Sequence, residues 1–192
     1  MSRSPSNPKG TRDFLPSTLS KRNYIIDIIK DNFKLFGFLE IETPALEKNS
    51  TLLGKYGNEG DRLVFKILNS GDKVKKADVN SLKKNNLSAF TDSISEKGLR
   101  YDLTVPLARF VAQHQNELVF PFKRYQIQNV WRADRPQHGR FQEFTQCDAD
   151  VIGPKSIIQE IELIKLYDAV FSQLGFNDII FKINHRSMLT AL

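Results

Sequence analysis

The sequence contains little that could build a disulfide, a metal centre or a membrane span. A single cysteine, Cys147, excludes an internal disulfide and any zinc site made of several cysteines. The three histidines, His114, His138 and His185, lack cysteine companions and HExxH spacing, so we expect no tightly bound metal. No apolar run approaches the roughly 18 residues of a membrane span, and residues 1–10 lack the apolar stretch of a signal peptide. These absences predict a cytoplasmic protein with no membrane segment.

Several common catalytic signatures are also missing. Neither the phosphate-binding loop GxxxxGK[ST] nor GxGxxG occurs, so a nucleotide would have to be held in another way. No GxSxG nucleophile elbow is present. Cys147 follows an alternating pattern that places it on the apolar face of a strand, which favours a packing role over a nucleophilic one.

Composition and charge indicate a folded, basic protein. Of 192 residues, 40% are hydrophobic and 26% charged, which is ordinary for a globular domain and excludes wholesale disorder. The formal net charge of +6 suggests a polyanionic partner without identifying it. Residues 123–140 carry five basic side chains against Asp134, whereas residues 141–168 carry six acids against Lys155 and Lys165. This contrast suggests a site for a ligand with both charges, such as an amino acid beside ATP; an accidental surface pattern is the alternative.

Local signals predict the elements of the first half. Residues 1–8 are expected to form a flexible leader. A helix should begin at Ser17 as its N-cap and end at Gly37, and a strand over 38–43 should stop at Pro44.

A loop over 54–62, a strand over 63–68 and an alternating strand over 99–105 are expected to follow. Between the two strands, the lysine-rich segment 69–97 is expected to be an exposed insertion. Pro106 fits the first turn of a helix that reaches about Gln115.

The second half predicts a hairpin and one long helix. Alternating stretches over 123–132 and 141–151 should pair around a polar loop. A helix over 154–174 is closed by Gly175, and a strand over 179–183 follows. A helix that starts at residues 187–192 would be too short to stand alone, which suggests the front part of a longer protein.

The expected strands place polar side chains together. Asp102 and Thr104 should project from one strand, and Phe144, Gln146, Asp148 and Asp150 from another, with Arg132 at the end of its partner. A half-exposed sheet with a polar outer face is the structural alternative, but an aromatic among these polar residues favours a stacking platform.

Four segments in order resemble the N-terminal catalytic region of the histidyl-tRNA synthetase family: KGTRDFLP (9–16), GFLEIETP (37–44), LRYDLTVP (99–106) and KRYQIQNVWRADRPQHGRFQEFTQCDADVIG (123–153). GFLEIETP is similar to class II motif 1, and WRADRPQHGRFQEF is similar to motif 2. Trp131 stands where the class usually has Phe or Tyr, and Asp134 stands where it usually has Glu. The resemblance covers nearly all of 9–192 and implies an α+β fold, an antiparallel sheet with flanking helices in a truncated class II catalytic core. The rest of the catalytic domain and the anticodon-binding domain are expected to be absent.

The resemblance also implies roles for individual residues. Arg132 would hold the ATP α-phosphate and the amino-acid carboxylate, and is the expected catalytic residue. Asp134, Arg140 and Phe144 complete the expected ATP site, where Arg140 would reach the γ-phosphate and Phe144 would stack under adenine. The expected histidine site is formed by Asp102, Thr104 and Gln146 at the α-ammonium group and Asp150 at the imidazole.

The implied activity is histidine–tRNA ligase: activation of L-histidine with ATP, with Mg²⁺ accompanying the nucleotide, and transfer to the histidine tRNA. The loop 133–139 would approach the tRNA, and Lys123 and Arg124 either add to that surface or are solvated cations. A homodimer through the motif 1 region is expected, and the truncated chain is expected to be inactive alone. The alternatives are a non-catalytic paralogue, such as the regulatory subunit of ATP phosphoribosyltransferase, and a plain basic RNA-binding module.

Overall fold

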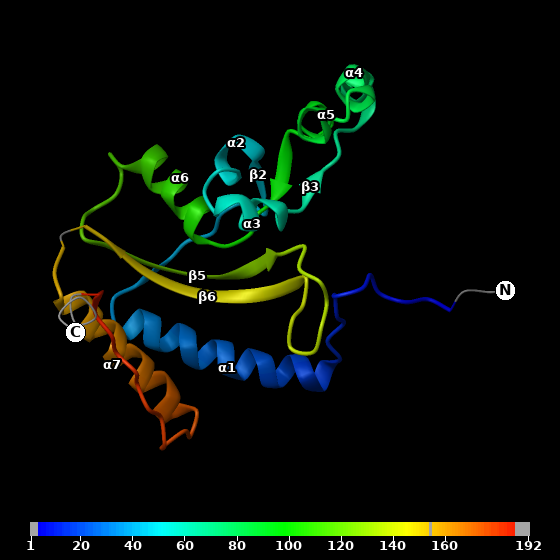
Figure 1. Cartoon of the computed structure of the whole chain (residues 1–192). Helices are drawn as coiled ribbons and strands as arrows, with labels where there is room; N and C mark the ends of the chain where they lie inside the picture. Colours follow the sequence, from blue (N-terminus) through cyan, green and yellow to red (C-terminus); the bar gives the residue numbers. More distant parts are fainter. Residues whose placement is uncertain (1–3, 154, 187–192) are drawn as a thin grey trace. The chain divides into compact units, whose positions relative to one another are not determined.

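The structure is a computed structural model that describes residues 4–153 and 155–186. It contains helices and two three-stranded sheets (Figure 1), which confirms the expected α+β class. The chain divides into two compact units. Unit 1 comprises residues 1–13, 40–119 and 125–148, and unit 2 comprises residues 14–39, 120–124 and 149–192.

One sheet is built entirely within unit 1. Its strands are β2 (Leu46–Lys48), β4 (Lys97–Leu99) and β3 (Lys66–Ile67), in the order β2-β4-β3 and antiparallel throughout. Gly98 in the central strand pairs with Glu47 on one side and Lys66 on the other. A Cβ at Gly98 would lie 3.0 Å from the carbonyl oxygen of Phe65, so a side chain would crowd the sheet.

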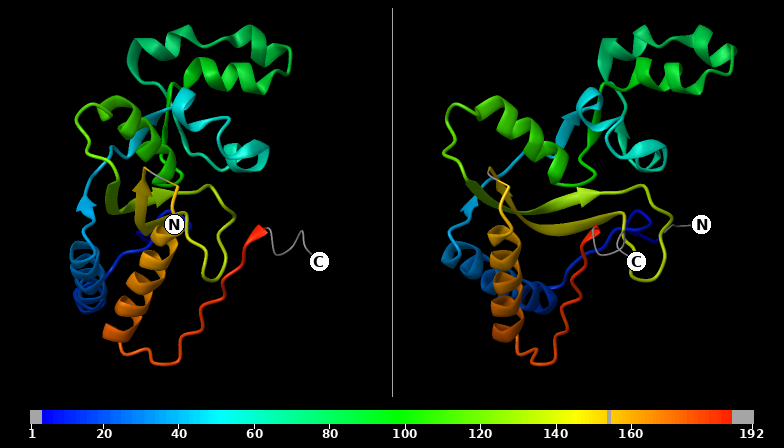
Figure 2. Two further views of the ribbon diagram at one scale, coloured as in Figure 1. Left: turned by 90° about the vertical axis from the view of Figure 1, so that its left-hand side faces the viewer. Right: turned by 60° about the vertical axis from the view of Figure 1, so that its left-hand side comes forward.

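Short helices surround this sheet. They are α2 (Asn49–Leu52), α3 (Gly57–Arg62) and α6 (Thr104–His114). The segment 69–97 forms the 3₁₀ helix η1 (Gly71–Lys76), α4 (Val79–Lys83) and α5 (Leu87–Ile94), none of which contains a buried residue. Figure 2 shows these last helices beyond the ends of β3 and β4.

The second sheet has the order β1-β5-β6, formed by β1 (Leu39–Glu40), β5 (Phe122–Trp131) and β6 (Glu143–Ile152). The predicted hairpin of β5 and β6 is confirmed. The Tyr125 carbonyl accepts a hydrogen bond of 3.1 Å from the Ile41 amide, so the first strand lies along β5.

Unit 2 is based on two helices, α1 (Pro16–Leu35) and α7 (Ile158–Gln173), which pack on one another (Figure 1). Asn32 Nδ2 donates to Gln173 Oε1 at 2.9 Å, and Phe33, Leu166 and Val170 are buried in the apolar core. Burial of such side chains stabilises the unit by about 1.5–3 kcal/mol each.

Both helices end on the glycines that the sequence indicates. Gly37 has φ +77°, and the amide of Phe38 donates to the carbonyl of Phe33 at 2.9 Å while their rings lie 6.0 Å apart. This is a Schellman motif, in which the left-handed residue favours glycine. Gly175 ends α7 in the same way, with φ +83°. The start of α1 was predicted less well, because its N-cap is Leu15 and not Ser17.

Arg100 connects three segments of unit 1 and is 3% exposed. Its Nη1 donates to the Thr43 carbonyl at 2.6 Å and to Gln128 Oε1 at 3.0 Å, and its Nε donates to the Asn129 carbonyl at 2.8 Å. A buried cation with these hydrogen bonds holds the end of motif 1, β5 and the chain after β4 together.

Other local predictions were wrong. Residues 57–62 form α3 where a loop was expected, and residues 179–183 belong to no strand. The strand over 38–43 is shortened to β1, and the expected N-terminal leader and the helix at 187–192 lie partly or wholly outside the described residues.

The expected strand over 99–105 is also wrong, because β4 ends at Leu99 and α6 begins at Thr104. Asp102 accepts a hydrogen bond of 3.2 Å from the amide of Val105, and this contact at the start of a helix competes with strand pairing. Cys147 is exposed, not packed on an apolar face.

Candidate active site

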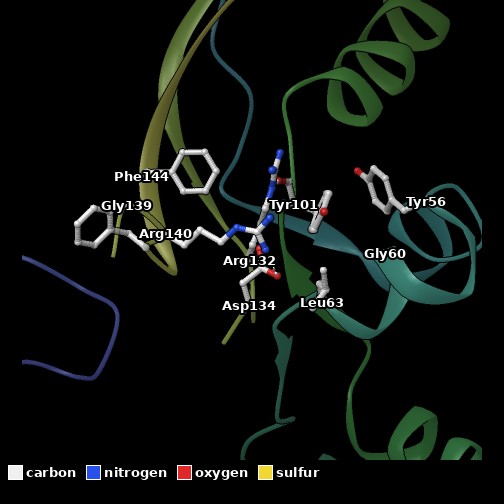
Figure 3. Close-up of a pocket in the computed structure, with 10 residues that line it drawn as sticks. Tyr56, Gly60, Leu63, Tyr101, Arg132, Asp134, Gly139, Arg140 and Phe144 are labelled. Atoms are coloured by element: carbon white, nitrogen blue, oxygen red, sulfur yellow. Dashed lines mark hydrogen bonds and ion pairs between the residues drawn. The ribbon is translucent and has the colours of Figure 1, made fainter. Parts of the chain in front are cut away.

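A cavity of about 630 Å³ lies within unit 1 (Figure 3). Its walls come from four parts of the chain: the 54–63 segment, Tyr101, the loop that follows β5, and β6. The lining residues are Tyr56, Gly60, Leu63, Tyr101, Arg132, Asp134, Gly139, Arg140, Phe141 and Phe144.

Arg132 lies between two aromatic rings. Its guanidinium carbon is 4.4 Å from the centroid of Tyr101 and 5.1 Å from that of Phe144. Its Nε donates to the Tyr101 carbonyl at 3.2 Å, and its amide donates to the Gln142 carbonyl at 2.9 Å. Among the described residues, its two terminal nitrogens have no hydrogen-bond partner. The side chain is therefore held in place while its outer donors stay available to a ligand.

The cavity carries more positive than negative charge. Figure 3 shows Arg132 and Arg140 converging on the middle of the cavity, and Asp134 is the carboxylate among the lining residues. The Arg140 Nη1 lies 3.8 Å from Asp134 Oδ1, and the Arg140 side chain is 62% exposed, so this ion pair is weak. Two guanidinium groups facing one space favour a polyanion there.

The loop after β5 is anchored by the segment that contains KGTR. The carbonyl of Gly10 accepts a hydrogen bond of 2.8 Å from the Gln142 amide, and the guanidinium carbon of Arg12 lies 3.5 Å from the centroid of the Phe141 ring. Gly10 has φ +86°, and a Cβ there would lie 2.7 Å from Gln142 Cγ. Only glycine fits this position without strain.

Asp102 lies next to the cavity through its contact with Tyr56. The Tyr56 hydroxyl donates to Asp102 Oδ1 at 2.9 Å, and the Tyr56 and Tyr101 rings are 4.7 Å apart. Burial, and then the negative charge of Asp102, raise the pKa of the Tyr56 hydroxyl well above its ordinary value. Tyr56 therefore stays protonated and acts as a donor to the carboxylate.

The remaining predicted site residues differ in their surroundings. Thr104 is exposed at the first position of α6. Gln146 lies on β6, and its Oε1 is buried without a hydrogen-bond partner among the described residues. Asp150 belongs to unit 2, where its carboxylate forms an ion pair with the fully buried guanidinium of Arg124.

The interpretation of Lys123 and Arg124 as solvated or RNA-facing cations was wrong. Arg124 is buried, and Lys123 Nζ pairs with Glu162 Oε1 at 2.6 Å and donates to the Phe36 carbonyl. Both side chains stabilise the fold because they bond inside unit 2.

Within residues 4–153 and 155–186, no group of three or more histidine, cysteine or acidic residues could hold a metal ion. Asp134 is the one carboxylate among the residues that line the cavity, and a single carboxylate suits only a metal ion, such as Mg²⁺, that takes most of its ligands from substrate and water. Among the helices of the described residues, none has the length and hydropathy needed to cross a membrane.

Comparison with known protein families identifies the family of this chain. The sequence model described as Histidyl-tRNA synthetase matches residues 76–192, which include β4, both long strands and α7. The chain belongs to the histidyl-tRNA synthetase family. The resemblance to this family that the sequence indicated is therefore confirmed.

The relatives of this synthetase-family chain are longer than the chain itself. The histidine–tRNA ligase of Christiangramia forsetii is 63% identical over 191 residues, which cover all of this chain and 42% of that protein. A histidyl-tRNA synthetase structure from Nostoc sp. PCC 7120 is similar with a TM-score of 0.76 and 30% identity, over 96% of this chain and 38% of that one.

A Bacillus halodurans structure described as an ATP phosphoribosyltransferase regulatory subunit/histidyl-tRNA synthetase has a TM-score of 0.69 and 26% identity, over 90% of this chain and 39% of that one. The expected class II synthetase fold is confirmed by these likenesses.

Sequence reasoning missed two residues of the candidate site. Tyr101 lies in the strand expected over 99–105, and Tyr56 lies in the loop expected over 54–62, and neither was singled out as a site residue. Both line the cavity, and both contact residues that had been predicted. Three glycines within seven residues (54, 57 and 60) were the available signal for a specialised loop around Tyr56.

Proposed function

We propose that this chain supplies the ATP- and histidine-binding part of a histidine–tRNA ligase. The observation that carries the proposal is the position of Arg132, which two rings and a carbonyl hold in place while its terminal nitrogens stay open to the cavity. The family membership supports histidine and ATP as the substrates. The chain spans 42% of the C. forsetii relative, so the ligase activity would belong to a longer protein.

The proposed first step is attack by a carboxylate oxygen of histidine on the α-phosphorus of ATP. The new O–P bond gives histidyl-adenylate, and the bond to the β-phosphate oxygen breaks to release pyrophosphate. The planar fork of Arg132 can bond to the carboxylate and the α-phosphate together, and its charge stabilises the pentacovalent transition state. Mg²⁺ bound to the phosphates would add charge neutralisation.

Two other cavity residues would hold the nucleotide. Arg140 has a flexible, mostly exposed side chain with one weak ion pair, which suits a contact to the γ-phosphate. The ring of Phe144, which lies on β6, would stack against adenine. Asp134, opposite Arg140, would restrain that arginine in the absence of nucleotide.

The histidine substrate would be held mainly by polar side chains. Asp102, Thr104 and Gln146 would receive the α-ammonium group, and the unpartnered Oε1 of Gln146 supports this role because buried acceptors are rarely left unbonded. Asp150 would face the imidazole, and its pairing with Arg124 would orient the carboxylate. Such a site rejects ligands that lack the matching hydrogen bonds.

In the second step a hydroxyl group of the terminal ribose of the histidine tRNA would attack the carbonyl carbon of histidyl-adenylate, in the cytoplasm. The new ester bond would form as the bond from that carbon to the AMP phosphate oxygen breaks, which would release AMP and the hydroxyl proton. The loop 133–139 would approach the acceptor end, and motif 1 (37–44) would form the interface of a homodimer. The regulatory paralogue is the weaker candidate, because a histidine sensor would not need Arg132 and Arg140 in one cavity.

Ligand binding to the chain tests the proposal directly. The compounds are the sulfamoyl analogues of histidyl-, prolyl- and threonyl-adenylate, and the measurement is the melting temperature as each is titrated. We expect an upward shift with the histidyl compound alone. No shift with any analogue, or equal shifts with all of them, would contradict a histidine-specific site.

Activity can be tested in a chimaera in which residues 1–192 replace the matching segment of the C. forsetii ligase, called the chimaera below. We expect histidine-dependent exchange of pyrophosphate into ATP. The same segment with Arg132→Ala serves as the control, and an active control would show that the activity comes from elsewhere.

A further inference from the structure

The segment 54–61 places one tyrosine against Asp102. We propose that Tyr56 is a positioning residue that orients the Asp102 carboxylate toward the α-ammonium group of the amino-acid substrate. The inference rests on the proposed function, since it concerns the same site. It assigns a role to a residue that touches the Asp102 carboxylate and would act on the substrate through it.

The backbone around Tyr56 forms a tight turn that leads into α3. The Gly54 amide donates to Asp61 Oδ2 at 2.7 Å, which joins the two ends of the segment. Gly54 and Gly57 have φ of +76° and +71°, a region in which other residues are strained. A Cβ at Gly60 would lie only 2.4 Å from Tyr56 Cβ, so the tyrosine packs directly over a glycine.

This turn places the Tyr56 hydroxyl beside its acceptor, the Asp102 carboxylate. The Tyr56 hydroxyl lies 2.9 Å from Asp102 Oδ1, and the ring packs on Tyr101 with a centroid separation of 4.7 Å. The Val105 amide donates to the same Oδ1 at 3.2 Å. Two donors therefore occupy one carboxylate oxygen, and among the described residues Oδ2 has no hydrogen-bond partner.

The chemistry of the pair suits a cationic ligand. A neutral hydroxyl fixes the rotation of the carboxylate and leaves its negative charge in place. A lysine or an arginine at this position would cancel that charge. The raised pKa keeps the Tyr56 proton in place at neutral pH. A carboxylate with one satisfied and one open oxygen recognises an ammonium group and favours it over a neutral analogue.

The test compares two ligands that differ only in the ammonium group. The probes are the sulfamoyl analogue of histidyl-adenylate and its counterpart without the α-amino group, and the measurement is the dissociation constant for the chain. Tyr56→Phe removes the hydroxyl and keeps the ring. We expect Tyr56→Phe to raise the dissociation constant of the amino compound about 10-fold, since a hydrogen bond to a charged group contributes this much. The dissociation constant of the des-amino compound should change less than about 2-fold.

Three further variants make the result specific. Tyr167→Phe, on an exposed tyrosine of α7, should change neither constant. Asp102→Asn should weaken the amino compound at least as much as Tyr56→Phe. Gly60→Ala should favour the short helix by its intrinsic propensity and yet weaken the amino compound, because the new methyl group must displace Tyr56.

The possible results separate the two proposals. If Asp102→Asn weakens the binding of the amino compound and Tyr56→Phe does not, the role of Tyr56 is overturned and the proposed function stands. Equal weakening of both compounds by Tyr56→Phe would show a structural role and also overturn the inference. No binding of either compound by the unaltered chain would contradict the proposed function itself.

Discussion

The guanidinium carbon of Arg132 lies 4.4 Å from the centroid of the Tyr101 ring, and its Nε donates to the carbonyl of the same residue. One residue thus contacts both the face and the edge of the arginine side chain. Arg132 follows β5, whereas Tyr101 follows β4, so the contact joins the two sheets of the fold. The catalytic arginine of the proposed reaction is therefore oriented before any ligand arrives.

Replacement of Arg132 should lower the rate of adenylation more than substrate affinity. We expect Arg132→Ala to reduce kcat for pyrophosphate exchange in the chimaera by ~10² or more, because the charge acts chiefly on the transition state. Arg132→Lys keeps the charge but loses the planar contact with Tyr101 and should recover only part of the rate. Arg62→Ala, at an exposed arginine outside the cavity, is the control. An unchanged kcat in Arg132→Ala would assign this residue a structural role.

Gly10 should be essential for the stability of the loop after β5. In Gly10→Ala the residue is strained by its positive φ and its Cβ meets Gln142. Gly139→Ala has a similar φ of +78° but no atom within 4 Å of the new Cβ. We expect urea unfolding to show a loss of ~1 kcal/mol for Gly139→Ala and about 1–3 kcal/mol more for Gly10→Ala. Equal losses would mean that the close contact has no energetic effect.

Loss of the buried Arg100 side chain should destabilise unit 1 strongly. Arg100→Met keeps much of the volume but leaves the carbonyls of Thr43 and Asn129 without their donors. We expect a loss of about 2–4 kcal/mol in the free energy of unfolding, measured with urea. Arg62→Met, on an exposed arginine, should change stability by less than about 0.5 kcal/mol. A change of that small size in Arg100→Met would contradict the assigned hydrogen bonds.

Stability should fall at alkaline pH because of Tyr56. Its pKa is raised in the folded state, so the folded chain retains a proton that the unfolded chain loses near its ordinary value of 10.0. The stabilising contribution is complete below pH 10 and decreases as the pH rises above it, by at most about 1.4 kcal/mol per pH unit. Because the ring borders an open cavity, screening by water keeps the slope below that limit.

Urea unfolding between pH 9 and 11 checks this expectation. The wild type should lose stability more steeply than Tyr56→Phe, whereas Tyr167→Phe should match the wild type. A Tyr56→Phe slope equal to that of the wild type would contradict a protonated, carboxylate-bonded tyrosine.

Short-range signals account for the elements that were predicted well. Gly37 and Gly175 end α1 and α7 because the backbone needs a residue in the left-handed conformation where it leaves each helix, and that requirement is local. The alternating patterns of 123–132 and 141–151 predicted β5 and β6 for the same reason, since alternation depends only on residues close in sequence. The order and spacing of the motifs were sufficient to indicate the family.

Contacts between distant segments account for what was missed. The alternation of 99–105 reads as a strand, but Asp102 bonds to the amide of Val105 and to Tyr56, and a helix begins at Thr104. The charge of Arg124 reads as exposed, yet Asp150 neutralises it in a buried position. No local pattern can encode such pairs, because their free energy depends on the partner that folding brings near.

The candidate site shows the same division. Arg132, Asp134, Arg140 and Phe144 were predicted from one continuous motif, and the structure brings them to one cavity because a hairpin keeps the two ends of its loop close. Tyr56 and Tyr101 lie 45 residues apart in sequence, and their rings meet only after the 54–61 segment, which leads into α3, has folded against the residues that follow β4. The motif residues follow from chain connectivity, whereas the two tyrosines that hold Arg132 and Asp102 follow from long-range packing.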